Sequence, residues 1–217
     1  MPTQAPFKRL ILRAVLRNVN PMVIRVVAMP DYLDLLDCDE VFRAILGWDG
    51  LGFIFRVHSQ EFNSFRRLTR SKTLRDFQLR PQEKFLYICG AIDLWEWEFR
   101  LLDQAAGDVP VCLGGRGAAP PEHCGGPTGY RLMLKREREG NSMCTPAQVE
   151  SVIGMLSAAD PDRPTNTWDM LRGMLDDGFK SIDQRLEQYG PLHPDRFNLQ
   201  DANQRLAQLV ERGRYRA

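Results

Sequence analysis

The feature of this sequence that most limits its fold is a two-residue alternation of apolar and polar side chains. It runs through residues 8–17 and again through residues 95–101. The apolar positions are Leu10, Leu12, Ala14 and Leu16 in the first run, and Trp95, Trp97, Phe99 and Leu101 in the second. Successive side chains of a strand point to opposite faces, so each run predicts a strand with one buried face and one solvent-exposed face. Strands of this kind are typical of antiparallel sheets.

The first hundred residues are expected to form hairpins around one helix. Residues 8–17 and 22–29 predict one hairpin, and residues 84–89 and 93–102 predict a second. Pro30-Asp31 predicts the start of a helix with Asp31 as its N-cap, and Gly47 predicts its end. The hydrophobic run at 51–57 predicts a further strand.

The second half of the chain has a different pattern. Residues 103–129 are rich in Gly, Pro and Cys without any period, which predicts a long loop. Helices are predicted at 130–139, 145–158 and 167–189, and from an Asn198 cap to about Arg212. Strands first and helices last predict an α+β fold: an antiparallel sheet built from hairpins, packed with one N-terminal helix and followed by C-terminal helices.

Composition excludes several function classes. The 217 residues carry a formal net charge of +1, so no bulk attraction to DNA or anionic membranes is expected. No apolar run reaches membrane-spanning length and no signal peptide is visible, so we expect a cytoplasmic protein without a membrane partner. Five cysteines form no CxxC pair, and three scattered histidines form no HExxH motif. Phosphate-binding glycine loops are also missing, and we expect no cofactor.

Residues 112–130 carry the most distinctive pattern: two cysteines, a Gly-Arg step, Pro-Pro-Glu, and then Gly-Gly and Gly-Tyr. This pattern closely resembles the signature of the plasmid pRiA4b ORF-3-like family. Shorter stretches that resemble the family in the same order are Asn20–Arg25 with Met29–Pro30, Ile45–Asp49, Phe85–Glu96 and Phe197–Leu206. The resemblance covers roughly residues 7–135 and 190–210.

The resemblance implies a compact α+β domain at 1–139, a helical insertion or extension at 140–189, and a family helix at 190–217 that packs back on the domain. The family is associated with plasmids and insertion sequences, and no established reaction can be carried over from it. Where family members commonly have histidines, this chain has Gly52, Ile54 and Trp97, and Gly90 and Ala119 replace a family Asp and Cys. We therefore expect a non-catalytic binding or accessory module of mobile elements.

The alternative is a nucleic-acid-processing or metal-dependent enzyme with its site near Asp49, Asp93 and the Cys112–Cys124 loop. Paired carboxylates would serve such a site as metal ligands or as acid and base, although both also suit turns. The candidate functional cleft consists of Trp48, Asp49, Asp93, Trp95, Arg116 and Glu122. The tryptophans would stack bases there, or belong to the core. Cys112, His123 and Cys124 are weaker metal candidates, because no fourth ligand is evident, and we expect no bound zinc.

A basic run provides the best candidate contacts for phosphate: Arg66, Arg67, Arg70, Lys72 and Arg75. Arg9, Arg13 and Arg17 would extend it if their face of the sheet is exposed. A local patch on a nearly neutral chain predicts weak, sequence-independent binding of nucleic acid. Another protein is the other expected partner, and the sequence carries no signal for an oligomeric state.

Overall fold

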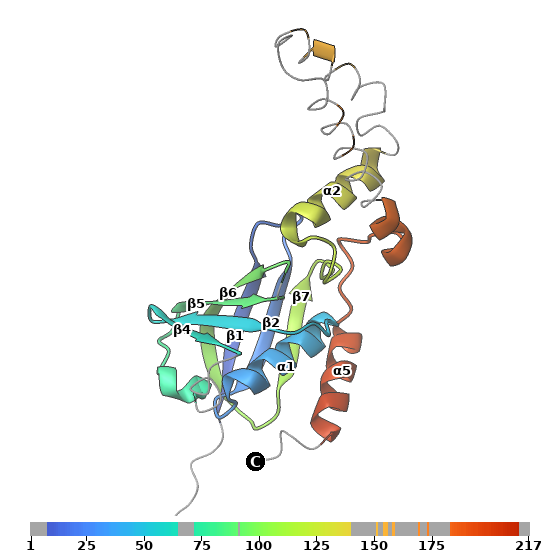
Figure 1. Cartoon of the computed structure of the whole chain (residues 1–217). Coiled ribbons are helices and arrows are strands. Elements are labelled where there is room, and N and C mark those ends of the chain that lie inside the picture. Colours follow the sequence, from blue (N-terminus) through green and yellow to red (C-terminus); the bar gives the residue numbers. More distant parts are fainter. Residues whose placement is uncertain are drawn as a thin grey trace, which may run out of the picture. The chain divides into compact units, whose positions relative to one another are not determined.

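A seven-stranded antiparallel sheet with the strand order β4-β3-β5-β6-β1-β2-β7 dominates the computed structural model (Figure 1). The structure describes residues 8–64, 72–90, 92–139 and 183–212, and the single positions 151, 154, 155, 158, 169 and 173. The strands are β1 (Lys8–Leu16), β2 (Ile24–Pro30), β3 (Phe53–Val57), β4 (Gln60–Asn63), β5 (Lys84–Cys89), β6 (Trp95–Ala106) and β7 (Val111–Arg116). The helices are α1 (Leu35–Leu46), the short 3₁₀ helix η2 (Leu74–Phe77), α2 (Gly126–Glu139) and α5 (Leu199–Glu211). The α+β class predicted from the sequence is confirmed.

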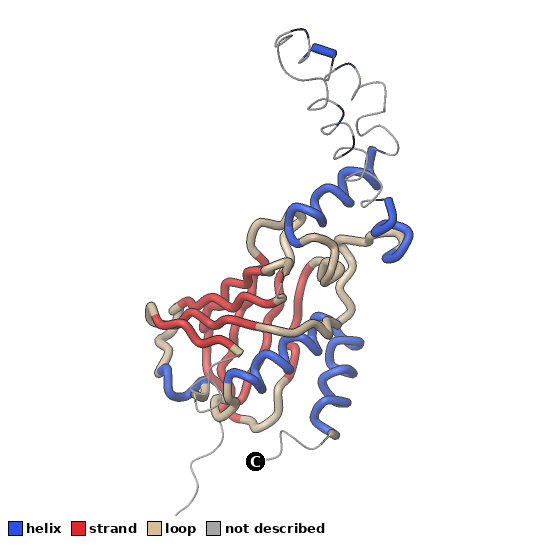
Figure 2. Tube along the Cα trace, viewed as in Figure 1, coloured by secondary structure: helices blue, strands red, loops and turns tan. Residues whose placement is uncertain are grey.

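One face of the sheet forms the core. The apolar positions of β1 and β6 that the alternation predicts are all buried on this face. Helix α1 covers it, with the Phe42 ring edge-on to Trp97 at 4.9 Å and to Tyr87 at 5.5 Å between ring centroids. Helix α5 lies beside α1 over the same face, next to β7 (Figure 2).

Helix α1 begins later in the chain than predicted. Its N-cap is Asp34, whose side chain accepts a hydrogen bond from the Asp37 N–H, and Asp31 as the cap is therefore wrong. Asp31 instead accepts hydrogen bonds from the guanidinium of Arg75 at 2.8 and 3.0 Å. The predicted end is confirmed, because Gly47 has a left-handed backbone conformation, with φ 74 degrees. Glycine adopts this conformation without strain, which is why it commonly ends helices.

The long loop predicted at 103–129 is wrong over much of its length. Strand β6 continues to Ala106, residues 111–116 form β7 against β2, and α2 begins at Gly126. A side chain at Gly115 would lie only 2.7 Å from the Ile24 carbonyl oxygen and 2.8 Å from the Phe197 ring. Gly115, a residue type that argues against a strand, is thus what allows this strand to lie close to Ile24 and Phe197.

The described residues form two compact units, one of residues 1–127 with 193–217 and one of residues 128–192. The predicted Asn198 cap of the last helix is confirmed, since its side chain accepts from the N–H groups of Gln200 and Asp201. Most residues of the helices predicted at 145–158 and 167–189 lie outside the described residues. The positions described there, which are 151, 154, 155, 158, 169, 173 and 183–189, are helical. None of the helices described has the length and apolar character needed to cross a membrane.

Candidate functional site

Glu122 is the centre of the candidate site. Its side chain is buried, and one carboxylate oxygen, Oε2, accepts hydrogen bonds from the N–H groups of Asp49 at 2.8 Å and Gly50 at 2.9 Å. The other oxygen, Oε1, accepts a hydrogen bond from Arg43 Nη1 at 2.7 Å, which both charges strengthen. The segment that follows α1 is therefore fastened to the segment between β7 and α2 through one carboxylate.

Arg43 extends this contact into a buried row of charges. Its Nε donates to the Asp39 carboxylate at 2.9 Å, and its Nη2 donates to the Gly52 carbonyl oxygen at 2.9 Å. Asp39 also accepts a hydrogen bond from the Tyr87 hydroxyl at 2.5 Å. Burial raises the pKa of Asp39, against the opposing effect of Arg43 and of the Tyr87 hydroxyl. Asp39, Arg43 and Glu122 thus bind α1, β5 and the 117–125 segment together.

Asp39 and Arg43 were not among the residues predicted from the sequence. A signal was present, because opposite charges at i and i+4 on a helix lie on one face. These two flank the apolar stripe of Leu35, Phe42 and Leu46. The usual interpretation of such a pair is a solvated helix face. Only the partner carboxylate of Glu122, from a distant segment, turns the pair into a buried network.

The two candidate tryptophans are part of the core. Trp95 is fully buried and donates its indole N–H to the Glu122 carbonyl oxygen at 2.8 Å. Trp48, which is 8% exposed, donates its indole N–H to the Pro120 carbonyl oxygen at 2.9 Å, and the two ring centroids are 5.6 Å apart. With both polar edges bonded and both rings covered, neither side chain offers a face on which a base could stack.

The other two cleft candidates differ in how they connect to this centre. Asp93 Oδ2 accepts a hydrogen bond from the Gly125 N–H at 3.0 Å, so it holds the same segment as Glu122. Arg116 ends β7 with an exposed side chain, and its carbonyl oxygen accepts from Arg25 Nη1 at 3.2 Å. The structure thus brings Trp48, Asp49, Trp95 and Glu122 together, attaches Asp93 to the same segment, and leaves Arg116 outside these contacts.

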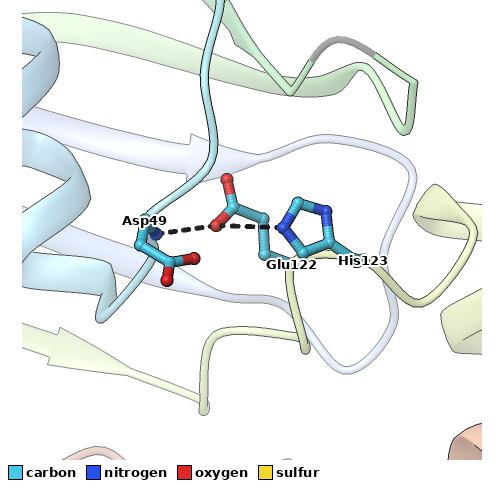
Figure 3. Close-up of side chains that lie close together, drawn as sticks. All are labelled: Asp49, Glu122 and His123. Atoms are coloured by element: carbon cyan, nitrogen blue, oxygen red, sulfur yellow. Dashed lines mark hydrogen bonds and ion pairs between the residues drawn. The ribbon is translucent and has the colours of Figure 1, made fainter.

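Glu122 and two neighbouring side chains form a group with the composition of a metal site (Figure 3). Ligand atoms of Asp49, Glu122 and His123 lie within 4.8 Å of one another, with His123 Nε2 3.9 Å from Glu122 Oε2. Asp49 and His123 are exposed. Glu122 already accepts three hydrogen bonds, so a cation would compete with Arg43 and two backbone N–H groups for its oxygens. Neither Cys112 nor Cys124 joins a group of this kind within the described part of the chain.

A groove of about 700 Å³ opens beside this network, between α1, the segment 48–53 and α5. Leu36 and Ala44 of α1, Leu51, Phe53 and Leu209 give it an apolar lining. Glu40, Asp49 and Arg212 add charged groups. Leu51 is 83% exposed.

The predicted basic run is only partly described. Arg66, Arg67 and Arg70 lie outside the described residues. The Lys72 carbonyl oxygen accepts from the Leu35 N–H, and Arg75 pairs with Asp31 as described above. Arg75 is therefore already committed to a carboxylate.

The remaining signature residues also bond to one another. Asn203 of α5 accepts from the Cys112 N–H at 3.0 Å and donates to the Cys112 carbonyl oxygen at 2.9 Å. The buried Arg25 guanidinium donates to the Gly117 carbonyl oxygen and lies 4.1 Å from the Phe197 ring centroid, within the range of a cation–π contact. Burial lowers the pKa of Arg25 to about 10. Each of these pairs connects segments far apart in the chain.

Comparison with known proteins agrees with this architecture. A sequence model described as "Plasmid pRiA4b ORF-3-like protein" matches residues 8–154. The uncharacterized protein y4hQ of Sinorhizobium fredii is 28% identical over 135 residues, which are 55% of this chain and 68% of that protein. The crystal structure of a protein of unknown function, MM3350 from Methanosarcina mazei Go1, superposes with a TM-score of 0.64 at 17% identity. That match covers 91% of this chain and 98% of the other, and it shows a shared fold.

Proposed function

We propose that this chain, which belongs to the plasmid pRiA4b ORF-3-like family, is a non-catalytic binding module whose ligand occupies the groove between α1, residues 48–53 and α5. In this proposal it acts as an accessory protein of plasmids or insertion sequences in the cytoplasm. The proteins it resembles are described as uncharacterised or of unknown function. The proposal therefore depends on the chemistry of the groove and its surroundings.

The observation that supports the proposal is that Glu122, Asp93, Trp48 and Trp95 already make hydrogen bonds within the protein. A general acid or base must exchange a proton with its substrate, and a metal ligand must offer a free lone pair. The Glu122 carboxylate instead holds Arg43 and two backbone N–H groups. Asp93 is bonded to Gly125, and the indole N–H groups of Trp48 and Trp95 are bonded to carbonyl oxygens. These residues stabilise the walls of the groove.

The groove itself suits a ligand with an apolar body and a few polar groups. Its volume lies inside the usual range of roughly 300–1,000 Å³ for small-molecule sites. The apolar lining would take the body of the ligand, and Glu40, Asp49 and Arg212 would fix its orientation. The Ser64 hydroxyl, which also lines the groove, is buried and has no hydrogen-bond partner among the described residues.

Ligand-observed NMR with a library of small amphipathic fragments tests this proposal. Ala44→Trp fills the groove from α1 and should abolish binding of the fragments that the unmodified protein binds. Ala207→Trp is the matched control, because Ala207 lies exposed on α5 and does not line the groove. Equal binding by both variants, with unchanged thermal unfolding, would exclude the groove.

The second candidate, a metal-dependent enzyme acting on nucleic acid, is favoured by the grouping of Asp49, Glu122 and His123 near Asp93 and the Cys112–Cys124 segment. Calorimetric titration with Mn²⁺ and Zn²⁺ distinguishes it from the first. Saturable binding of one ion, lost in both Asp49→Asn and His123→Ala, together with metal-dependent turnover, would replace the binding proposal. Unchanged heats in both variants would leave the metal site unsupported.

A further inference from the structure

The face of the sheet opposite α1 and α5 carries a row of positive charge. Arg13 on β1, Arg100 on β6 and Lys84 on β5 occupy directly opposed positions on three neighbouring strands: Arg13 is in register with Arg100, and Arg100 with Lys84. Opposed residues of neighbouring strands project on the same face. We call these three residues the cationic row. Their side chains point away from the core, and those of Arg100 and Lys84 are 35% and 47% exposed.

This arrangement is unfavourable without an anion. Like charges directly opposite each other destabilise a sheet. One carboxylate, that of Glu98 on β6, lies 2.7 Å from Lys84 Nζ and 4.0 Å from Arg100 Nη2. No side chain in the described ranges forms an ion pair with Arg13, and the Arg100 Nε is buried without a hydrogen-bond partner there. Lys84 and Arg100 thus share one carboxylate, and Arg13 has no carboxylate partner among the described residues.

Neighbouring cations on this face, in contrast to Arg13, do form ion pairs with carboxylates. Arg17 pairs with Glu96, and Arg56 pairs with Glu61, each within this same face. A hollow of about 370 Å³ lies beside the row, and its charged lining residues include Arg17, Arg56 and Lys84 together with Glu83 and Glu98. The positive charge that is not balanced by a close carboxylate is therefore concentrated on Arg13 and Arg100.

We propose that this open face binds the phosphate backbone of a nucleic-acid duplex through the cationic row. Strands in a sheet are spaced about 4.8 Å apart, so three adjacent cations present charge over roughly 10 Å, as a polyanion requires. No aromatic side chain of the described strands projects on this face. Single-strand binders depend on aromatic platforms that stack bases, so this surface fits a duplex and contacts it without reading sequence. The site is on the opposite face of the sheet from the groove and goes beyond the function proposed above.

Fluorescence anisotropy with two unrelated 20-base-pair DNA duplexes tests the proposal. Three phosphate contacts predict a slope of log affinity against log salt of about −2.7, or roughly fortyfold weaker binding at 200 mM than at 50 mM salt. Both duplexes should bind alike. The triple variant Arg13→Gln, Lys84→Gln and Arg100→Gln should bind at least tenfold more weakly at 50 mM salt and lose most of the salt dependence.

The matched control is Arg131→Gln, Lys135→Gln and Arg138→Gln, which removes the same charge from exposed positions of α2. It should retain the affinity of the unmodified protein. Equal losses in the two triple variants would mean that net charge alone is responsible, and would overturn the proposal. Tighter binding of a (dT)20 single strand, or equal competition by polyglutamate of the same charge, would overturn it in favour of single strands or of an acidic protein.

The triple variant should unfold at the same or a higher temperature, because it removes opposed like charges. If the triple variant does not fold, the salt dependence of DNA binding is measured with the single variant Arg13→Gln instead. Loss of one phosphate contact should reduce the salt slope by about 0.9. An unchanged slope would exclude Arg13 from the interface and with it the cationic row.

Discussion

Among individual residues, Glu122 has the largest structural consequence. It is a buried carboxylate that accepts hydrogen bonds from one guanidinium and two backbone N–H groups, and without it Arg43 Nη1 and both N–H groups would lose their acceptor. A buried charge pair adds little stability over apolar packing, but removing one partner alone is costly because the other charge remains buried. The same residue that makes the site look catalytic is thus needed to keep α1 and the segment 48–50 in place.

Glu122→Gln should lower the free energy of unfolding by about 3 kcal/mol, the lower end for breaking a buried pair, because Arg43 retains Asp39. Urea denaturation followed by tryptophan fluorescence measures this. The control is Glu61→Gln, which breaks the exposed pair with Arg56. That variant should change the free energy of unfolding by about 0.5 kcal/mol or less, as is usual for a solvated pair. Similar small losses in both variants would show that the network carries no stability.

The buried thiols should be chemically inert in the folded protein. Desolvation raises the pKa of Cys89 to about 12 and also raises the pKa of Cys38 and Cys112. At pH 8 only about one Cys89 side chain in ten thousand is then a thiolate, which is the reactive form. Iodoacetamide at pH 8 should label these three cysteines only after urea is added, as read by peptide mass spectrometry. Rapid labelling of any of them in the native protein would contradict the burial described here.

At the scale of elements, β7 is an edge strand that is closed by a side chain. The Asn203 amide occupies both the N–H and the carbonyl oxygen of Cys112, as the backbone of a neighbouring strand would. Unpaired edges invite association with other chains, and covering the edge with a helix prevents it. Helix α5 therefore completes the sheet where no eighth strand follows in the described part of the chain.

Asn203→Ala should cost about 1–3 kcal/mol, because it leaves two backbone groups of β7 without partners. It should also increase aggregation, measured by light scattering during thermal unfolding. Gln204→Ala on the exposed side of the same helix controls for helix propensity and should leave both measurements unchanged. Equal behaviour of the two variants would mean that the edge needs no cover.

The elements that could be predicted well from the sequence are those with strict alternation or clear caps. β1, β6 and α5 follow directly from the buried positions of their side chains and from Asn198. β7 was not predictable, because Cys112-Leu-Gly-Gly-Arg116 lacks a two-residue period and Gly115 allows a close approach to Ile24 and Phe197. The start of α1 was misplaced because Asp31 and Asp34 both suit an N-cap, and only the contact between Asp31 and Arg75 distinguishes them.

The candidate site was predictable in composition but not in role. Trp48, Asp49, Trp95 and Glu122 do come together. Their roles depend on which hydrogen bonds they already make, and those partners are mostly backbone groups, which every residue carries and no sequence motif marks. The buried pair of Asp39 and Arg43 shows the same limit, since its burial depends on a residue from a distant segment.

At the scale of the whole molecule, the unit that contains the sheet is discontinuous in sequence. Residues 193–217 return to it after the intervening unit of residues 128–192. These residues make three contacts with the sheet unit. Phe197 packs on the Arg25 guanidinium, and Asn203 hydrogen-bonds to β7. Arg205 donates hydrogen bonds to the Ala44 and Ile45 carbonyl oxygens at the end of α1. The sheet unit therefore depends on its last segment for three separate contacts.

A chain that ends at residue 192 should lose cooperative thermal unfolding of the sheet unit, because the end of α1 and the edge of β7 lose their partners. Circular dichroism and amide NMR spectra measure this. Addition of a synthetic peptide of residues 193–212 should restore a cooperative transition. Cooperative unfolding of the shortened chain at the original temperature would show that α5 is dispensable.

The return of α5 also has a consequence for synthesis on the ribosome. Cys112 is translated well before Asn203, the residue that covers its backbone groups. At typical elongation rates the interval between the two is on the order of 5 to 18 seconds. During that interval the nascent sheet presents the edge of β7 to its surroundings. Slower translation between the two segments lengthens this exposure, so synonymous codon choice within residues 128–192 should influence the soluble yield of the protein without changing a single amino acid.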